Sequence, residues 1–504
     1  MADTAAVKER KTKSKVEHFD VLIAGAGISG VGAAYHLKTQ TPKKKFVVLE
    51  AYESFGGTWY MHRYPGIRSD SDLYTFGYRF KPWVGPPIAS REEILKYMGE
   101  VIEEAGLAEH IRYRHKIRSA SWSSAKKKWT VKAENLETGD VLTFTANFLW
   151  MCQGYYNHAQ GYTPEWPGMA DFKGEIVHPQ SWPDDMDLTG RKVICIGSGA
   201  TAATVVPAIA GKCEHVTLLQ RSPTYFIPAR NENVLADELR MLGVDDAWIH
   251  EIVRRKYNHD QAEFTRRSFE EPEVVRQELL DGVKACLPED FDMSHFTPSY
   301  RPWRQRIAFV PEADLFEGIK AGQASVVTDH IDRFTEKGIL LKSGNELEAD
   351  VIITATGFDL SVLGNIPFEV DGEPVDWSKT ITYRGMMFTG VPNLAWVFGY
   401  FRASWTLRVD MMGDLICRLL KHMDRKKVKQ VEVALRAQDH NMEILPWIDE
   451  ANFNPGYLAP LDAPDAKARH NARLAAHAGL LAGEGRIPED RPRRGRIPLQ
   501  LRQL

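Results

Sequence analysis

Two strand–glycine–helix units, about 170 residues apart, most constrain the fold of this chain. In the first, the apolar run Asp20–Ala24 precedes GAGISG, a helix-like stretch and a second apolar run, Phe46–Glu50. The same order returns with Lys192–Ile196, GSGATA, another helix-like stretch and His215–Leu219. Such βαβ units build parallel sheets, and a glycine turn between strand and helix can cradle a pyrophosphate. The sequence therefore predicts an α/β fold with two Rossmann-like dinucleotide-binding domains.

The first glycine turn supplies Gly25, Gly27 and Gly30, and Glu50 ends the strand that follows. Gly25 is expected to make the tight turn, Gly27 to let the backbone approach a pyrophosphate, and Gly30 to allow close helix packing. The helix start offers N–H groups to phosphates, and Glu50 can accept hydrogen bonds from ribose hydroxyls. An ordinary glycine turn is the alternative, and the combination of strand, helix and acidic residue favours dinucleotide binding over it.

The second glycine turn has Gly197 and Gly199, with Ala202 where a third glycine would otherwise stand. The strand that follows ends near Arg221 and Ser222 rather than in a carboxylate. Arg221 can pair with a 2′-phosphate and Ser222 can donate a hydrogen bond to it, whereas an acidic residue would repel it. A solvated surface arginine is the alternative interpretation of Arg221. An acidic anchor first and a basic anchor second together predict FAD at the first site and NADPH at the second.

The length of 504 residues indicates more than one hydrophobic core. Charged, helix-favouring sequence follows the second unit and predicts a helical insertion. We expect an FAD-binding domain over 18–155 and 355–462, an NADP-binding domain over 156–225 and 304–354, and the helical insertion over 226–303. The ends are expected to form a flexible basic arm over 1–17 and a poorly ordered tail over 463–504.

Composition narrows the classes of partner. The formal net charge of −3 offers no general attraction for nucleic acid, which favours a small-molecule substrate. No apolar run approaches the roughly 18–20 residues of a membrane span, and no apolar segment follows the basic start, so a cytoplasmic location is expected. The five cysteines form no CxxC pair and no metal-ligand cluster. Because no redox cysteine pair is available to accept electrons from a flavin, O2 is the expected acceptor.

Two longer motifs resemble one enzyme family. The stretch Phe172–Pro183, FKGEIVHPQSWP, matches the fingerprint FxGxxxHxxxWP of Baeyer–Villiger monooxygenases, and Gly56–Asp70, GGTWYMHRYPGIRSD, is similar to their second signature. The resemblance covers about 18–457 and includes ATG at Ala355–Gly357. It implies an FAD-dependent enzyme that uses NADPH and O2 to convert ketones to esters or lactones through a C4a-peroxyflavin, and that also oxidises sulfides.

Three other functions stay open at this point. The first is an N- or S-oxygenating flavin monooxygenase, although these relatives usually end the fingerprint differently. The second is a flavin reductase or NADPH oxidase that releases peroxide without oxygenating a substrate. The third is a nucleotide-sensing or assembly protein that reuses the fold without catalysis.

The resemblance also implies catalytic residues. Arg306, in RPWRQRIAFVP, takes the place of an arginine that stabilises negative charge beside the flavin, and Asp70 matches the carboxylate that orients it. Arg301 and Arg304 are competitors for this role, and the cluster can also be a solvated basic turn. His178 is expected to couple NADP binding to domain rotation rather than to transfer a proton, with a purely structural linker role as the alternative.

Further cofactor contacts follow from the same resemblance. Thr58 and Trp59 are expected against the flavin, Ser29 on the phosphates and Ile117 at the adenine, while Arg68 and Ser69 are candidate NADP contacts beside Asp70. Trp59 can instead belong to a domain core, and Trp405 can line a substrate pocket or pack in the core. The predicted cofactor-binding residues are Gly25, Gly27, Ser29, Gly30, Glu50, Thr58, Trp59, Arg68, Ser69, Asp70, Ile117, Gly197, Gly199, Ala200, Thr201, Ala202, Arg221 and Ser222.

Overall fold

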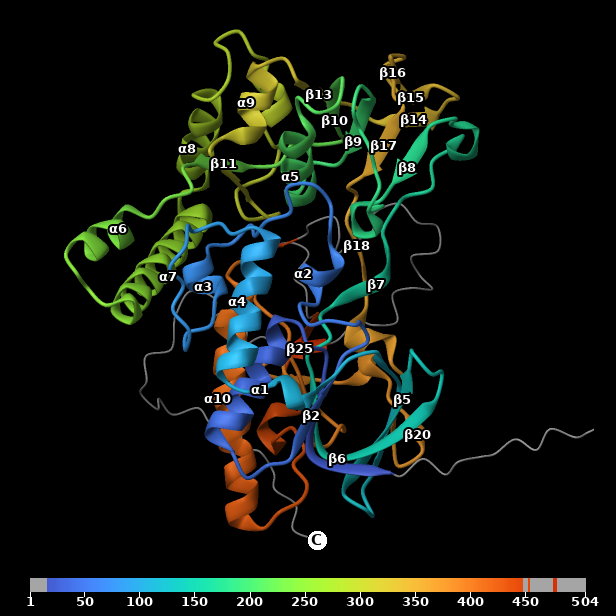
Figure 1. Ribbon diagram of the computed structural model, residues 1–504, viewed down its shortest axis with the longest axis vertical. Helices are drawn as coiled ribbons and strands as arrows, with labels where there is room; N and C mark the ends of the chain where they lie inside the picture. Colours follow the sequence, from blue (N-terminus) through green and yellow to red (C-terminus); the bar gives the residue numbers. More distant parts are fainter. Residues whose placement is uncertain (1–15, 447–451, 454–474, 478–504) are drawn as a thin grey trace, which may run out of the picture.

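The first strand–glycine–helix unit belongs to the larger of two main sheets, and its elements α1 (Ile28–Gln40) and β2 (Phe46–Leu49) are labelled in Figure 1. The computed structural model describes residues 16–446, 452–453 and 475–477. Strand β1 (Glu17–Ala24) runs parallel to β2 (Phe46–Leu49) on one side and to β6 (Val141–Met151) on the other. The strand order is β20-β19-β4-β5-β6-β1-β2-β3, and β23 pairs with β6. The remaining strands are β3 (Ile111–Arg112), β4 (His115–Ser123), β5 (Lys128–Asn135), β19 (Phe368–Val370), β20 (Glu373–Pro374) and β23 (Leu394–Trp396).

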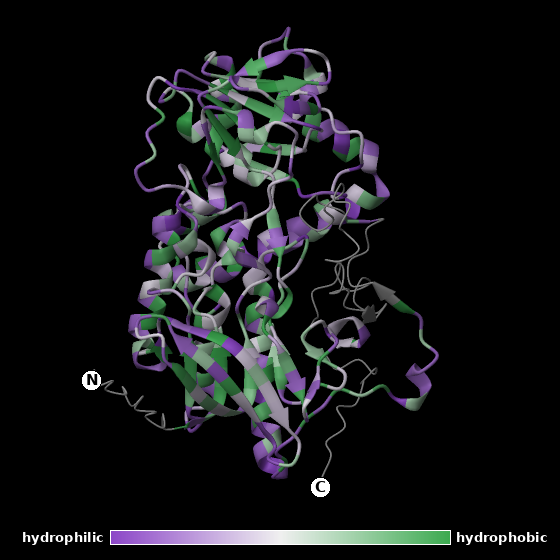
Figure 2. Ribbon diagram, turned by 90° about the vertical axis from the view of Figure 1, so that its right-hand side faces the viewer, coloured by the Kyte–Doolittle hydropathy of each residue, from purple (hydrophilic) through white to green (hydrophobic). Residues whose placement is uncertain are grey.

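The second unit forms the centre of the smaller sheet, whose order is β13-β10-β9-β17-β8 with parallel pairing throughout. Its strands are β8 (Glu175–Val177), β9 (Lys192–Ile196), β10 (His215–Gln220), β13 (Ala324–Thr328) and β17 (Val351–Thr354). Every residue of β17 is buried, whereas burial alternates along the antiparallel strand β5. The central strands β9 and β17 are almost entirely apolar, and the strands in the upper part of Figure 2 are largely green, as expected of a parallel sheet covered on both faces. The predicted α/β class with Rossmann-like domains is confirmed.

Helices cover the sheets and start at recognisable signals. Helix α4 begins with a capping box, in which Ser90 and Glu93 each bond the backbone N–H of the other. Helix α10 buries a stripe that includes Val409, Met412 and Ile416, and it packs against α1. The helices outside the insertion are α1 (Ile28–Gln40), α2 (Thr58–Met61), α3 (Leu73–Phe76), α4 (Arg91–Glu104), α5 (Ala200–Ile209), α9 (Asp314–Lys320) and α10 (Trp405–Lys426).

The predicted insertion is mostly helical, with α6 (Val234–Met241), α7 (Asp246–Glu270) and α8 (Pro272–Lys284). Residues 226–229 differ from this expectation, because they form strand β11, which pairs in parallel with β12 (Ala308–Pro311). The insertion contributes to both cores. Ile249 and Val253 of α7 pack in the core that contains β1, while Val283 of α8 packs in the core of the smaller sheet.

Two extended segments, β7 (Tyr156–Gly161) and β18 (Phe358–Leu360), run between the lobes and pair with each other antiparallel (Figure 1). Because each main sheet draws its strands from two stretches of the chain, we propose that the domains divide at 155/156, 225/226, 303/304 and 354/355. The predicted arm lies outside the described residues except at 16–17, and the predicted tail does so except at 475–477.

Short elements complete the described part of the chain. The remaining strands are β14 (Ile331–Phe334), β15 (Gly338–Leu341), β16 (Glu346–Glu348), β21 (Thr382–Tyr383), β22 (Met387–Phe388), β24 (Ile444–Pro446) and β25 (Ala475–His477). The 3-10 helices are Ala108–His110, Met169–Asp171, Pro179–Ser181, Met293–Phe296, Val362–Asn365, Trp377–Lys379 and Ala437–Asp439. Among these described residues, no helix is long and apolar enough to cross a bilayer.

Candidate active site

A cleft between the two sheets collects most of the predicted site residues. Its volume is about 1590 Å³, larger than the roughly 300–1,000 Å³ typical of a pocket for one drug-sized ligand. The predicted residues in its lining are Gly25, Gly27, Ser29, Glu50, Thr58, Trp59, Arg68, Asp70, Ile117, Gly197, Gly199, Ala200, Thr201, Arg221, Ser222 and Arg306. Those outside the lining are Gly30, Ser69, His178 and Ala202. The cleft therefore has room for more than one ligand at a place where both glycine turns open.

The first glycine turn is too tightly packed for side chains at two of its three glycines. Gly25 has a φ of +96°, and a Cβ there would lie 2.8 Å from the carbonyl oxygen of Cys152. A Cβ at Gly30 would lie 1.8 Å from the carbonyl oxygen of Gly25. Gly27 precedes α1 and lines the cleft. The start of α1, with its unbonded N–H groups, therefore opens toward the cleft.

The acidic residue at the end of β2 is held by backbone N–H groups. Glu50 Oε2 accepts a hydrogen bond from Ala26 N–H at 2.6 Å, and Oε1 accepts one from Tyr52 N–H at 2.9 Å. The side chain is 5% exposed, and burial raises the pKa of Glu50. Each carboxylate oxygen keeps a further lone pair. Glu50 is thus a fixed acceptor at the cleft, as a ribose anchor requires.

Ser29 on the first turn of α1 is bonded by a tryptophan. Trp405 Nε1–H donates to Ser29 Oγ at 2.7 Å, and the Trp405 ring stacks on Tyr155 with centroids 5.2 Å apart. Because the hydroxyl oxygen is the acceptor in this bond, the O–H of Ser29 stays available to a phosphate oxygen. Trp405 also lines the cleft, so both alternatives for it, core and pocket wall, apply at once.

Two predicted flavin contacts, Thr58 and Trp59, and the predicted adenine contact Ile117 line the same cleft. Thr58 Oγ1 lies 2.6 Å from the hydroxyl of Tyr156. The Trp59 ring meets Phe76 edge to face at 5.8 Å and packs against the cores of both lobes while it lines the cleft. Ile117 lines the cleft from β4, next to a shift in the register with β5. The placement of these residues in the cleft supports their proposed roles without testing them.

The second glycine turn is open toward the cleft. Gly197 has a φ of +134°, and a Cβ there would lie 2.3 Å from the carbonyl oxygen of Ala355. Gly199 precedes α5, and a Cβ there would meet no protein atom within 4 Å. Ala202 is fully buried, so it serves helix packing as the third position of such a turn does. Ala200 and Thr201 open α5 and line the cleft.

An acidic residue that sequence reasoning missed, Asp329, follows β13 and lies beside the end of β10. Arg221 and Ser222 are exposed at the cleft, and Asp329 N–H donates to the carbonyl oxygen of Gln220 at 3.0 Å. The Asp329 carboxylate accepts from the backbone N–H of His330 at 2.6 Å. A hydrogen bond from the side chain of Ser343, with further bonds from the backbone of His330 and Ser343, holds the pKa of Asp329 below its usual range. A 2′-phosphate bound here has to lie on the Arg221 side of this carboxylate.

Among the three candidate arginines, Arg306 is the one that lines the cleft. Its Nη2 lies 3.0 Å from Asp70 Oδ2, and both side chains are about one third exposed. Arg301 instead bonds Asn452 Oδ1 at 3.1 Å, and Arg304 is exposed outside the cleft. The resemblance favours Arg306, whereas the residue types alone do not separate the three arginines, because which of them faces the cleft depends on the turn that precedes β12.

The side chains of the two residues before Asp70 bond other parts of the protein. Arg68 forms a two-point ion pair with Asp314, at 2.5 and 3.1 Å, although it also lines the cleft. Ser69 is buried, and its hydroxyl oxygen accepts from Ala89 N–H at 3.2 Å. The Ser69 hydroxyl thus bonds within the protein, and the predicted contact of Ser69 with NADP stays a prediction.

The paired segments that connect the two sheets, β7 and β18 with the stretch leading into it, are called the linkers below. His178 contacts both linkers and does not line the cleft. Its Nε2 lies 3.1 Å from the carbonyl oxygen of Gly357, and Nδ1 accepts from Gln180 N–H at 3.1 Å. Burial lowers the pKa of His178, which favours the neutral ring with the proton on Nε2. Because both ring nitrogens bond the backbone, the geometry favours the indirect role over proton transfer.

We expect Gly161→Ala to destabilise the paired linkers, because a Cβ there would lie 1.9 Å from His178 Cε1. Overpacking of this kind costs about 1–3 kcal/mol in the free energy of unfolding. Thermal or urea unfolding measures the cost. In a His178→Ala background the same substitution should cost much less, since the clashing ring is gone. Equal costs in the two backgrounds would show that this contact does not matter.

The cleft wall contains a buried histidine, His62, which no sequence signal singled out. His62 is 2% exposed, and its Nε2 has no hydrogen-bond partner among the described residues. Its ring contacts Tyr156 and Phe358 of the two linkers, with centroids 6.1 and 5.4 Å away. Burial lowers the pKa of His62 to about 4, so the ring is neutral near pH 7. These neighbours are about 95 and 295 residues away in the chain, which is why local patterns missed the site.

Comparisons with known proteins agree with this geometry. A family model described as flavin-binding monooxygenase-like matches residues 84–372, and one for an NAD(P)-binding Rossmann-like domain matches 23–83. The probable FAD-binding monooxygenase AlmA of Acinetobacter baylyi is 46% identical over 82% of this chain and 83% of its own length. The FAD-containing monooxygenase EthA of Mycobacterium tuberculosis is 45% identical over 88% of this chain and 89% of its own. A solved steroid monooxygenase bound to NADP superposes with a TM-score of 0.68 at 25% identity, covering 83% of this chain and 88% of that one.

Proposed function

The chain belongs to the flavin-binding monooxygenase-like family, and from this we propose that it is a Baeyer–Villiger monooxygenase that converts ketones to esters or lactones. It is a flavoprotein that uses FAD and NADPH. In the proposed reaction, one atom of O2 enters the ketone beside its carbonyl carbon and the other leaves as water.

The first glycine turn fits FAD. The start of α1 behind Gly27 offers N–H groups to the pyrophosphate, Ser29 adds its O–H, and Glu50 offers a fixed carboxylate to the ribose. Thr58 and Trp59 would hold the flavin ring from α2. When bound, FAD takes two electrons from NADPH and uses them to activate O2.

The second turn fits NADPH. The open space beside Gly199, which a side chain would enter, suits the close approach of a pyrophosphate to the backbone. Arg221 and Ser222 at the end of β10 would hold the 2′-phosphate. The two turns and both linkers line one cleft, so the same cavity can hold both cofactors.

The Arg306–Asp70 ion pair is the observation that carries the proposal of ketone oxygenation. Attack of an oxygen nucleophile on a ketone places negative charge on the carbonyl oxygen, and a fixed guanidinium stabilises that charge. Oxygenation of a sulfide places positive charge on sulfur, which the same guanidinium disfavours. Asp70 holds the guanidinium in position and limits its motion. A cation at this point of the cleft therefore favours ketones over heteroatom substrates.

Product analysis with isotopically labelled O2 tests this proposal. The purified FAD-loaded enzyme is incubated with NADPH and a panel of linear, cyclic and aryl ketones, together with alkyl and aryl sulfides. We expect esters or lactones that carry one labelled oxygen, and NADPH consumption that rises with the ketone. Sulfoxides alone would place the enzyme in the heteroatom-oxygenating class, and peroxide alone would make it an oxidase.

We expect Arg221→Ala to raise the KM for NADPH about 10- to 100-fold, the size of a lost charge-assisted contact of about 1.5–3 kcal/mol. The KM for NADH should change by about 2-fold or less, because NADH has no 2′-phosphate. Initial rates at varied concentrations of each nucleotide measure both values.

Arg191 provides a matched control on the same sheet. Arg191 directly precedes β9, so it lies at the amino end of the strands, whereas Arg221 follows the carboxyl end of β10. The Arg191 side chain pairs with Glu175 at 2.5 Å. Arg191→Ala should leave both KM values unchanged. An unaltered ratio of the NADPH and NADH values in Arg221→Ala would exclude Arg221 from phosphate recognition.

A further inference from the structure

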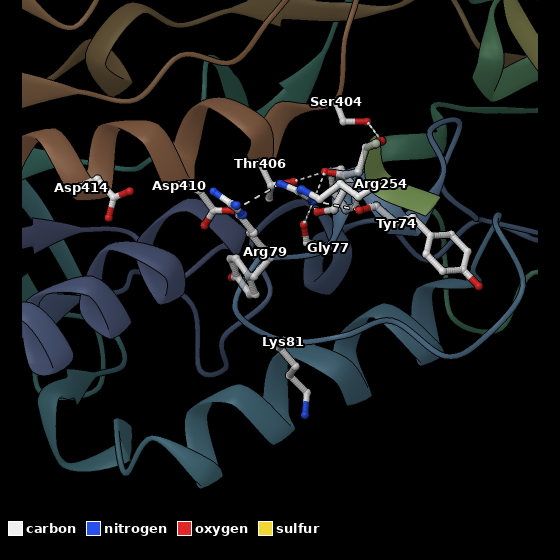
Figure 3. Close-up of polar contacts among 12 residues, drawn as sticks. Tyr74, Gly77, Arg79, Lys81, Arg254, Ser404, Thr406, Asp410 and Asp414 are labelled. Carbon is white, nitrogen blue, oxygen red and sulfur yellow. Dashed lines mark hydrogen bonds and ion pairs between the residues drawn. The ribbon is translucent and has the colours of Figure 1, made fainter. Parts of the chain in front are cut away.

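A buried arginine of the helical insertion reaches into the lobe of the larger sheet. Arg254 lies on α7 and is 5% exposed. Its Nη1 donates to the carbonyl oxygens of Tyr74 at 2.8 Å and Gly77 at 2.9 Å, and more weakly to that of Thr75 at 3.2 Å. Its Nη2 lies 3.3 Å from Asp410 Oδ2 (Figure 3). The guanidinium is therefore surrounded by acceptors from two other elements, α3 with its following loop and α10.

The carbonyl groups that Arg254 bonds lie at and beyond the end of α3, which has a single turn, Leu73–Phe76. The last carbonyls of a helix have no partner within it, and leaving them buried without a donor is costly. Arg254 supplies the donors from another part of the chain, and its positive charge suits a helix C-terminus. The position of α3 thus depends on the insertion.

Asp410 connects the same arginine to two more segments. Its Oδ2 also accepts from Arg79 N–H at 2.9 Å, and its Oδ1 lies 3.3 Å from His36 Nε2 on α1. The side chains of Arg254 and Asp410 are 6% and 10% exposed, so each charge needs the other. Removing the guanidinium would leave a buried carboxylate between α1 and α10.

Hydrogen bonds lead from this cluster to the cleft. Thr75 Oγ1 lies 2.5 Å from Ser404 Oγ, and Thr406 Oγ1 donates to the Thr75 carbonyl oxygen at 3.0 Å (Figure 3). Trp405 lies between Ser404 and Thr406 in the chain, and its Nε1–H donates a hydrogen bond to Ser29 Oγ in the cleft wall. The start of α10 is thereby fixed relative to α3.

The other end of the same segment carries the ion pair of the proposed mechanism. Asp72 accepts from Thr75 N–H at 2.8 Å and begins α3, two residues after Asp70. Phe76, on the last turn of α3, contacts the Trp59 ring. A shift of α3 would therefore move residues on both sides of the proposed flavin site.

We propose that Arg254 is a positioning residue, through which the helical insertion fixes segments 70–79 and 403–406 for FAD binding and oxygen transfer. These segments carry the cleft-lining residues Asp70, Ser71, Phe76, Ala403 and Trp405. This inference rests on the proposed function for its second half. Arg254 is not among the residues that line the cleft, and it acts by holding α3 and the start of α10.

Arg254→Met removes the donors while keeping much of the side-chain volume, and Arg254→Lys restores the charge without the forked donors. Val253→Ala is the matched control, because Val253 is the preceding residue of α7, is fully buried in the same core and makes no polar side-chain contact. Arg255→Ala, at an exposed neighbouring arginine, controls for the charge change.

Three readouts separate positioning from general stability. These are the FAD dissociation constant, amide hydrogen exchange in 72–79 and 403–406, and the ratio of oxygenated product to NADPH consumed. For Arg254→Met we expect a rise in the FAD dissociation constant of about 10-fold or more, faster exchange in both segments and a lower product ratio. Arg254→Lys should recover part of each, and Val253→Ala should lower the melting temperature with FAD affinity within about 2-fold of wild type.

The proposal is overturned if Arg254→Met and Val253→Ala, compared at equal loss of melting temperature, show the same FAD affinity and exchange pattern. If Arg254→Met does not fold, Arg254→Lys and Asp410→Asn decide the question by the same comparison. Failure of the proposed function is a separate outcome. A wild-type enzyme that binds FAD but oxygenates no ketone would refute that function, while FAD affinity and hydrogen exchange would still test Arg254.

Discussion

Replacing Arg306 with alanine is expected to lower ester formation by about 10³-fold, close to 4 kcal/mol in the activation free energy. The guanidinium is the cation that stands beside Asp70 in the cleft, and its loss leaves the developing negative charge on the carbonyl oxygen without a partner. The Asp70 carboxylate would remain there and would repel that charge. Reduction of the bound flavin by NADPH should persist, because neither glycine turn nor Arg221 is altered.

Two measurements separate these effects. Anaerobic mixing with NADPH follows the bleaching of the flavin, and product analysis under air follows the ester. Arg304→Ala is the matched control, since Arg304 lies two residues earlier, is exposed and stays outside the cleft. It should behave as wild type, and Arg306→Lys should fall between the two, because lysine keeps the charge but not the planar donor set. A normal ester yield in Arg306→Ala would remove this residue from the mechanism.

The second large effect is expected for Gly30→Ala, which should abolish stable FAD binding. The added Cβ would lie 1.8 Å from the carbonyl oxygen of Gly25, so α1 has to move away from its turn by about 1 Å or more. That movement carries with it Ser29 and the N–H groups that we propose for the pyrophosphate. Overpacking against backbone also costs about 1–3 kcal/mol of stability.

The ratio of flavin to protein after purification measures the first effect, and thermal unfolding with and without added FAD measures the second. Gly282→Ala is the control, because a Cβ on this α8 residue meets nothing within 4 Å. It should keep full FAD content and gain about 0.5–1 kcal/mol from the higher helix propensity of alanine. Full FAD occupancy in Gly30→Ala would show that close packing at this turn is not required.

The sequence predicted the two nucleotide-binding units because each is encoded within a short stretch. A strand, a turn that demands glycine and a helix follow one another in about 30 residues, and their periodicities are local. The positive φ at Gly25 and Gly197 and the parallel pairing on both sides of β1 and β9 agree with that pattern. The predicted family resemblance is confirmed for flavin-binding monooxygenases.

The sequence alone did not predict the direction in which individual side chains point. Arg301, Arg304 and Arg306 stand within six residues, and residue type alone does not show which of them faces the cleft. The chain reversal before β12, which includes a positive φ at Trp303, turns Arg306 to the cleft. Likewise Ser69 stands beside Asp70 but bonds Ala89 inside the protein. A single residue step in extended chain reverses the direction of a side chain, so neighbours in a motif need not share a site.

Long-range partners were equally hidden. His62 meets the two linkers, and Arg254 meets α3 and Asp410, across separations of about 95 to 295 residues. The sequence by itself determined the two glycine turns, the sheets they belong to and the residue types at their strand ends, because these depend on neighbours in the chain. The arginine that the resemblance favours is the one that faces the cleft, but the tertiary structure alone decided how the insertion is fixed to the cleft wall, because buried charges and carbonyl groups take whichever partners the packing of distant segments brings within hydrogen-bond distance.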